Sequence, residues 1–153
     1  MAEHSFLVSI LAIEISRRIG HSNSRGGPIN IEKEHQIMRW AMWHDLPEVI
    51  NGDQPTPTKA TLKMVAGFDV SKRADHMVSR EYAKIEAETF STIKSIVKLA
   101  DLLEARIFLQ EEGKGEHSRE VHSGVIKQID EHLKKCKRDY QTFNWDAITA
   151  LLM

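Results

Sequence analysis

Four polar residues stand in segments that are otherwise apolar, and their side chains are of the types that bind divalent metal ions. They are two histidines and two aspartates: His4, His44, Asp45 and Asp101. Imidazole nitrogens and carboxylate oxygens form a mixed donor set that suits a borderline divalent ion such as Mn, Co, Fe or Zn. Such a set also leaves coordination positions for water. Together the four residues indicate a metal site.

Asp101 is the least expected of the four. It shares a helix face with the apolar Val97, because residues four apart lie on the same side of a helix. A carboxylate that faces a core is costly unless a cation or hydrogen-bond donors compensate it. The alternative is that Asp101 lies at the edge of the apolar stripe and pairs with Lys98 or Arg106.

His44 and Asp45 are adjacent, so in the middle of a helix their side chains would point about 100° apart. They can still converge on an ion that lies against the helix between them. His4 follows Glu3 in the first turn of a predicted helix, where Glu3 could orient a ligating imidazole by accepting its ring N–H. The alternative is an acid favoured by the helix dipole beside a solvent-facing histidine.

The elements that must position these residues are predicted to be helices. Apolar residues recur with a helical period, and sustained period-two alternation is absent from the sequence. Gly20 and Gly113 are expected to end helices, and the prolines in 53–59 exclude a helix there. The fold class is therefore all-α, a bundle of about six helices, over 2–19, from Asn30 to Gly52, within 62–89 as one short and one longer helix, over 92–112, over 118–140 and after Asn144.

Length and charge limit the function. The chain has 153 residues, 41% hydrophobic and 28% charged, which is the size and composition of one globular domain. Its formal net charge of −1 gives no field that would attract a nucleic-acid polymer or an anionic membrane. The lone Cys136 favours a reducing compartment, and neither a membrane span nor a signal peptide is visible. We expect one cytoplasmic domain over residues 1–153 that binds neither a nucleic-acid polymer nor a membrane.

Three stretches resemble, in order, the motifs of HD-domain metal-dependent phosphohydrolases. They are AEHS at Ala2–Ser5, WHDLPEVINGDQPTPTK at Trp43–Lys59 and IVKLADLLEA at Ile96–Ala105. The middle stretch is the specific one, because it resembles the form HDxxEvxxGDxPTPxK of the bacterial YfbR-like 5′-deoxynucleotidases. The resemblance spans the chain from Ala2 to about Leu109, and it implies that the helical bundle is a single HD domain.

The resemblance also implies roles for individual residues. One divalent ion (Co, Mn, Zn, Fe or Mg) would be bound by the four residues named above. Glu48 would activate or orient the attacking water, which fits its position four residues after His44 on a continued helix. Asp53 would contact the sugar. The remaining implied contacts are substrate contacts from Gln54, Pro55, Thr56 and Lys59, with Lys98 and Glu3 as supporting residues around the metal and the phosphate.

The predicted activity is hydrolysis of a deoxynucleoside 5′-monophosphate to a deoxynucleoside and phosphate. One alternative is a deoxynucleoside triphosphate hydrolase, for example one for dATP, that releases triphosphate from a roomier phosphate pocket. A second alternative is a non-catalytic nucleotide-binding HD module, which the presence of Glu48 and all four candidate ligands disfavours. The expected partners are a small deoxynucleotide and further copies of the same chain.

The sequence departs from the group at its start. Members usually carry a helix before the first motif, with an Arg-Trp pair that helps to hold the nucleotide, whereas this sequence begins at Met1 directly on the motif. We expect that helix to be missing and assign no base-binding residue from it. Trp40 and Trp43 do not match the pair in position, and the segment between the second and third motifs is shorter than in the bacterial enzymes.

Overall fold

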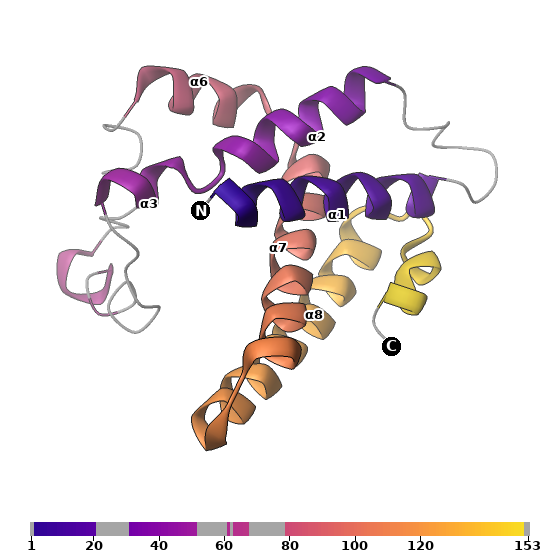
Figure 1. Ribbon diagram of the computed structural model, residues 1–153. Helices are drawn as coiled ribbons and strands as arrows, with labels where there is room; N and C mark the ends of the chain where they lie inside the picture. Colours follow the sequence, from indigo (N-terminus) through magenta and orange to yellow (C-terminus); the bar gives the residue numbers. More distant parts are fainter. Residues whose placement is uncertain (1, 21–30, 52–60, 62, 68–78, 152–153) are drawn as a thin grey trace.

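The described part of the chain is built from helices alone. The computed structural model describes residues 2–20, 31–51, 61, 63–67 and 79–151, and each element named within them is a helix (Figure 1). The predicted all-α fold is confirmed. The elements are α1 (Ala2–Gly20), α2 (Ile31–Trp43), α3 (Leu46–Asn51), α6 (Arg80–Glu88), α7 (Ser91–Glu112), α8 (Gly115–Asp139) and the 3₁₀ helix η1 (Trp145–Leu151).

Helix α7 lies at the centre of the molecule. It packs against α1, α2 and α8, and Figure 1 shows it crossing α1 and α2 before it pairs with α8. A helix surrounded by other helices is apolar around much of its circumference, and this is what the sequence of α7 provides. Its buried residues are Ile93, Ser95, Ile96, Val97, Leu99, Ala100, Leu102 and Leu103.

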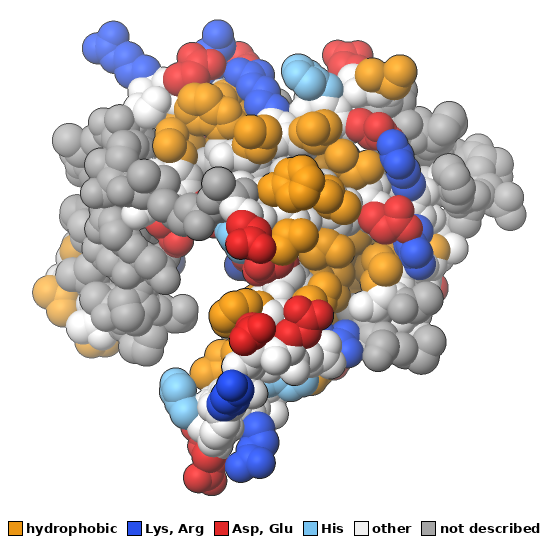
Figure 2. All heavy atoms as spheres, viewed as in Figure 1, with side chains coloured by type: hydrophobic (Ala, Val, Ile, Leu, Met, Phe, Trp, Pro, Cys, Tyr) orange, Lys and Arg blue, Asp and Glu red, His pale blue; other side chains and the backbone are white. Residues whose placement is uncertain are grey.

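Helix α1 buries one face against α7 and α2. Val8, Ala12, Ile15 and Ile19 recur at helical spacing and are at most 1% exposed. Other apolar residues of α1 lie outside the buried face: Phe6, Leu7 and Ile10 are 63%, 40% and 48% exposed. Hydrophobic side chains accordingly gather on the surface along α1 and α2, as Figure 2 shows.

The connection between α7 and α8 depends on two glycines. A Cβ atom at Gly113 would overlap the carbonyl oxygen of Leu109 and the hydroxyl of Ser118. Gly115 has a φ of 86°, a left-handed conformation that favours glycine. Helix α7 therefore ends where the sequence predicted, whereas α8 begins at Gly115, three residues before the predicted start.

None of the helices within the described ranges is both long enough and apolar enough to cross a membrane. The interpretation of residues 1–153 as one domain stays a prediction.

Candidate metal centre

His44 and Asp45 lie in a turn between two helices. The N–H of His44 donates to the carbonyl of Trp40 at 2.9 Å, and the N–H of Glu48 donates to the carbonyl of Asp45 at 2.9 Å. The prediction of one helix continuing to Gly52 is wrong, because α2 ends at Trp43 and α3 begins at Leu46. Pro47 supplies the physical reason: proline cannot donate to the helix ladder, and its ring would clash with the carbonyl four residues earlier. Outside a regular helix, neighbouring side chains can face one centre.

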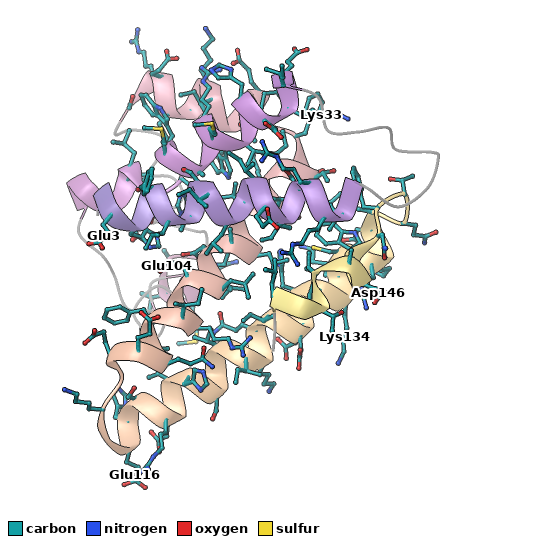
Figure 3. The ribbon with its side chains drawn as sticks, turned by 45° about the vertical axis from the view of Figure 1, so that its right-hand side comes forward. Glu3, Lys33, Glu104, Glu116, Lys134 and Asp146 are labelled. Atoms are coloured by element: carbon teal, nitrogen blue, oxygen red, sulfur yellow. The ribbon has the colours of Figure 1, made fainter. Side chains whose placement is uncertain are left out.

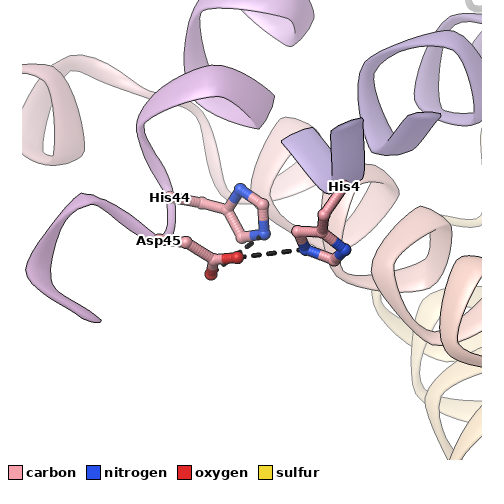
Figure 4. Close-up of side chains that lie close together, drawn as sticks. All are labelled: His4, His44 and Asp45. Carbon is pink, nitrogen blue, oxygen red and sulfur yellow. Dashed lines mark ion pairs between the residues drawn. The ribbon is translucent and has the colours of Figure 1, made fainter. Parts of the chain in front are cut away.

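The turn brings Asp45 between two imidazole rings. Its Oδ2 lies 3.0 Å from His4 Nε2, and its Oδ1 lies 3.1 Å from His44 Nε2 (Figure 4). The two ring centroids are 5.9 Å apart. One donor atom from each of these three residues lies within 4.8 Å of the other two, a spacing that would allow the three atoms to hold one metal ion.

Asp101 reaches the same group from α7. Its Oδ1 lies 3.6 Å from His4 Nε2, while its Oδ2 accepts from Lys98 Nζ at 2.7 Å. The structure thus contains the ion pair that the sequence offered as an alternative, and it also places Asp101 beside His4. Both are possible because the carboxylate has two oxygens with different partners.

The second nitrogen of each ring is also occupied. His44 Nδ1 lies 2.7 Å from the carbonyl oxygen of Ala41, so Nδ1 carries the proton and donates it. His4 Nδ1 lies 3.0 Å from Oε2 of Glu104. In both rings Nε2 is the nitrogen that faces the cluster.

The residues present fit a divalent ion. His44 Nε2 is buried and makes no hydrogen bond to any described residue, because its 3.1 Å approach to Asp45 lacks hydrogen-bond geometry. An imidazole whose Nδ1–H is held by a carbonyl and whose Nε2 is left open is the usual arrangement of a ligating histidine. Together with the carboxylates, it gives the mixed nitrogen and oxygen donors that Zn²⁺ and similar ions accept.

Two other predicted site residues, Glu48 and Glu3, lie on the helices α3 and α1. Glu48 lies on α3 and is half-buried. Glu3 lies in the first turn of α1 with an exposed side chain, and the contact to an imidazole that was proposed for it is made to His4 by Glu104 (Figure 3 labels both). Asp53, Gln54, Pro55, Thr56 and Lys59 lie outside the described residues.

Sequence reasoning missed Glu104. The available signal was its position three residues after Asp101, which places both carboxylates on one face of α7. The contact with His4 arises because α1 crosses α7 at that point.

The helical fold, with a first histidine, a His-Asp pair and a later aspartate gathered at one centre, defines the class of HD-type metal-dependent phosphohydrolases. The chain belongs to the 5′-deoxynucleotidase YfbR-like family, whose sequence pattern matches residues 1–147. The expected membership, the enzyme class and the requirement for a divalent metal are confirmed at this level. Phosphohydrolysis of deoxynucleotides, the predicted function, is likewise supported by the family and its members.

Proteins similar to this chain in structure or sequence include phage phosphohydrolases. The structure of the cyanophage S-2L HD phosphohydrolase (DatZ), bound to dA and one catalytic Zn²⁺ ion, matches with a TM-score of 0.74 and 26% identity, over 97% of this chain and 78% of that one. The dATP triphosphohydrolase of Acinetobacter phage SH-Ab 15497 is 27% identical over 164 residues, which cover 100% of this chain and 78% of that protein. That of Salmonella phage PMBT28 is 30% identical over 137 residues, 88% and 66% of the two chains.

Proposed function

We propose that this protein cleaves the bond between the 5′-oxygen and the α-phosphorus of a deoxynucleotide, with one divalent ion bound by His4, His44, Asp45 and Asp101. The observation that carries the proposal is the buried, unbonded Nε2 of His44. A buried polar atom without a hydrogen bond costs about 1–3 kcal/mol. A cation within reach of this nitrogen and the Asp45 carboxylate would remove that cost, because both offer lone pairs to it.

The chemistry then divides between the ion and the chain. A bound divalent ion would polarise a phosphoryl oxygen and make a water molecule more acidic at neutral pH. Glu48, on the helix that follows the His44–Asp45 turn, would accept the proton of the attacking water. Lys98, with a side chain 55% exposed beside Asp101, can approach the negative charge of the phosphate. In-line attack at the α-phosphorus would release the nucleoside through its 5′-oxygen.

The substrate could carry one phosphate or three. The relatives from the Acinetobacter and Salmonella phages are named dATP triphosphohydrolases, which supports dATP as substrate with release of triphosphate. The family description names a 5′-deoxynucleotidase, which supports a monophosphate. Both reactions break the same bond, and the solved relative holds dA, so we propose deoxyadenosine 5′-phosphates as the substrates to test first.

Product analysis tests this directly. The protein would be incubated with dATP or dAMP in the presence of Zn²⁺, Co²⁺ or Mn²⁺, in water enriched in ¹⁸O. We expect deoxyadenosine from both nucleotides, with triphosphate from dATP, phosphate from dAMP, and the label in the phosphorus-containing product. Formation of dADP and labelled phosphate from dATP would place the cleavage at the γ-phosphorus and refute the proposal. Nucleotide binding without turnover under any metal would favour a non-catalytic module.

We further propose that the protein acts in the cytoplasm, on free nucleotides and not on polymers, as an oligomer of identical chains. The net charge of −1 supports the choice of small substrates. The oligomer is supported by a groove of about 450 Å³ between α1 and α2, which is lined largely by apolar side chains, among them Phe6, Ile10, Met38 and Met42. Light scattering on the purified protein tests it, and a monomer at working concentration would refute it.

A further inference from the structure

His4 lies among three carboxylates, and its two ring nitrogens face different ones. Nε2 lies 3.0 Å from Asp45 and 3.6 Å from Asp101, on the side where His44 also lies. Nδ1 lies 3.0 Å from Oε2 of Glu104. The Glu104 side chain is 18% exposed, so solvent screens this contact only in part. Glu104 is therefore the carboxylate bonded to the ring nitrogen that faces away from the proposed ion.

The two nitrogens of His4 must differ in protonation when the site is filled. A nitrogen that binds a metal offers its lone pair, so the proton of the neutral ring sits on the other nitrogen. Because Nε2 faces Asp45 and His44, that proton is on Nδ1, where Glu104 accepts it. The hydrogen bond fixes both the tautomer and the rotation of the ring.

In His44 the Nδ1–H has a different acceptor. Its Nδ1–H donates to the backbone carbonyl of Ala41, which is neutral, whereas that of His4 donates to a carboxylate. A charged acceptor makes a stronger hydrogen bond than a neutral one and holds the imidazole more firmly in place. Of the two histidines, His4 is therefore the one whose affinity for the ion depends on a replaceable side chain.

Helix α7 provides the geometry for this. Asp101 and Glu104 are three residues apart on the same face, so one helix presents one carboxylate to each nitrogen of His4. The contact joins residues 100 positions apart in the chain, so it depends on the packing of α1 against α7.

We propose that Glu104 is a positioning residue of the metal centre: its carboxylate accepts the Nδ1–H of His4 and holds Nε2 toward the ion. This rests on the proposed metal-dependent function, but it concerns the strength of metal binding and can be measured without nucleotide.

The test compares the metal affinity of the wild-type protein with that of Glu104→Ala and Glu104→Gln. Titration calorimetry with Zn²⁺ or Co²⁺ alone gives the dissociation constant, and thermal unfolding of the metal-free proteins reports any general loss of structure. The amide oxygen of glutamine can still accept the Nδ1–H, so Glu104→Gln tests rescue by the conservative variant. Glu111→Gln, at an exposed glutamate of the same helix, is the matched control.

We expect Glu104→Ala to raise the dissociation constant by roughly 10- to 100-fold, the usual effect of removing the acceptor behind a ligating histidine. Glu104→Gln should fall between Ala and wild type, and Glu111→Gln should match wild type. In the Zn²⁺-loaded, ¹⁵N-labelled protein, the Nδ1–H signal of His4 should be protected from exchange and lose that protection in Glu104→Ala.

Wild-type affinity in Glu104→Ala, or equal losses in the Ala and Gln variants, would overturn the inference. If Glu104→Ala does not fold, Glu104→Met decides, because it has a similar length and no acceptor for the Nδ1–H: an unchanged dissociation constant with an unchanged Nδ1–H signal overturns the inference. The proposed function fails separately, when the wild-type protein binds metal but hydrolyses no deoxynucleotide.

Discussion

Asp101 is the residue at which metal binding and ordinary ion pairing compete most directly. One of its oxygens faces His4 and the other accepts from Lys98. Lys98 is more than half exposed, so its pairing with Asp101 is screened by solvent and contributes little to stability. A divalent ion beside His4 would interact with the same carboxylate far more strongly, because it carries twice the charge and is shielded from water on several sides.

We expect Asp101→Asn to lose most metal affinity and activity while its helical content stays near that of wild type. The amide preserves the shape of the side chain and removes the charge that balances the ion. Circular dichroism and metal titration on the same preparation measure both quantities. Lys98→Met is the control for metal affinity and helical content, because it breaks the ion pair and leaves the carboxylate in place. Unfolding of Asp101→Asn even with added metal would instead make Asp101 a structural residue.

A substitution at Glu48 distinguishes an effect on catalysis from an effect on binding. We expect Glu48→Ala to keep metal and nucleotide affinity and to lower turnover by about 10²-fold or more, the usual scale for losing a positioned acid or base. The reason is that the proposed ligands already hold the ion, so removing Glu48 raises only the barrier and changes kcat more than KM. Phosphate release and calorimetry measure the two effects. Turnover equal to that of wild type would leave Glu48 without a role in the reaction.

The sequence was sufficient to propose His4, His44, Asp45 and Asp101, because their residue types are unusual for the apolar segments around them. It was not sufficient to find Glu104. A glutamate in a helix has many ordinary explanations, and the contact of Glu104 with His4 arises only from the crossing of two helices.

At the scale of the elements, apolar periodicity and helix-stop residues predicted most of the helices. The prediction failed where an apolar period continued past a proline. Helix α7 was predicted within one residue at its start, and its end was predicted at Glu112 because the apolar run is followed by Gly113. The continuous helix through His44 failed because the apolar period was followed past Pro47. The exposed apolar residues of α1 could not be foreseen, because periodicity shows which side chains share a face, but not which of those side chains a neighbouring helix covers.

The contact between α8 and α7 gives the protein a pH-dependent element away from the metal centre. Burial lowers the pKa of His132, and the nearby cations of Lys135 and Lys98 lower it further, against the opposing effect of its hydrogen bond to the Ser95 carbonyl. That bond is 2.9 Å long, with Nε2–H as the donor. Folding therefore favours the neutral ring.

Because the pKa of His132 is lowered in the folded protein, its contribution to stability decreases at low pH. Above the ordinary value of 6.5 the ring is neutral in both the folded and the unfolded chain, and the stability from burying it is fully present. As the pH falls below 6.5 toward the lowered value, the unfolded chain takes up the proton first, so this stability is lost. We expect His132→Gln, which keeps a donor but does not titrate, to show a shallower loss of stability below this pH in denaturant titrations. Parallel curves for the two proteins would contradict this.

At the scale of the whole molecule, the candidate site joins parts of the chain that are distant in sequence. His4 comes from the start of α1, His44 and Asp45 from the turn after α2, and Asp101 from the middle of α7. The whole protein is nearly neutral, so its negative charge near His4 is local and comes from the side chains of Asp45, Asp101 and Glu104. A divalent ion would both link these elements and offset that charge.

This arrangement predicts that metal binding stabilises the fold as a unit. A ligand that binds only the folded chain adds about 2.7 kcal/mol when its concentration is 100 times the dissociation constant. For a protein of this size that corresponds to a rise in Tm of about 5–10 °C. We expect Zn²⁺ or Co²⁺ to produce such a rise in a calorimetric scan and a chelator to reverse it. Asp101→Asn should show little rise, because it lacks a proposed ligand of the folded site. Binding of the ion to histidines of the unfolded chain would affect the variant and the wild type alike. An equal rise in the variant and the wild type would show that the ion binds elsewhere, and the proposed centre would then not be the one that stabilises the fold.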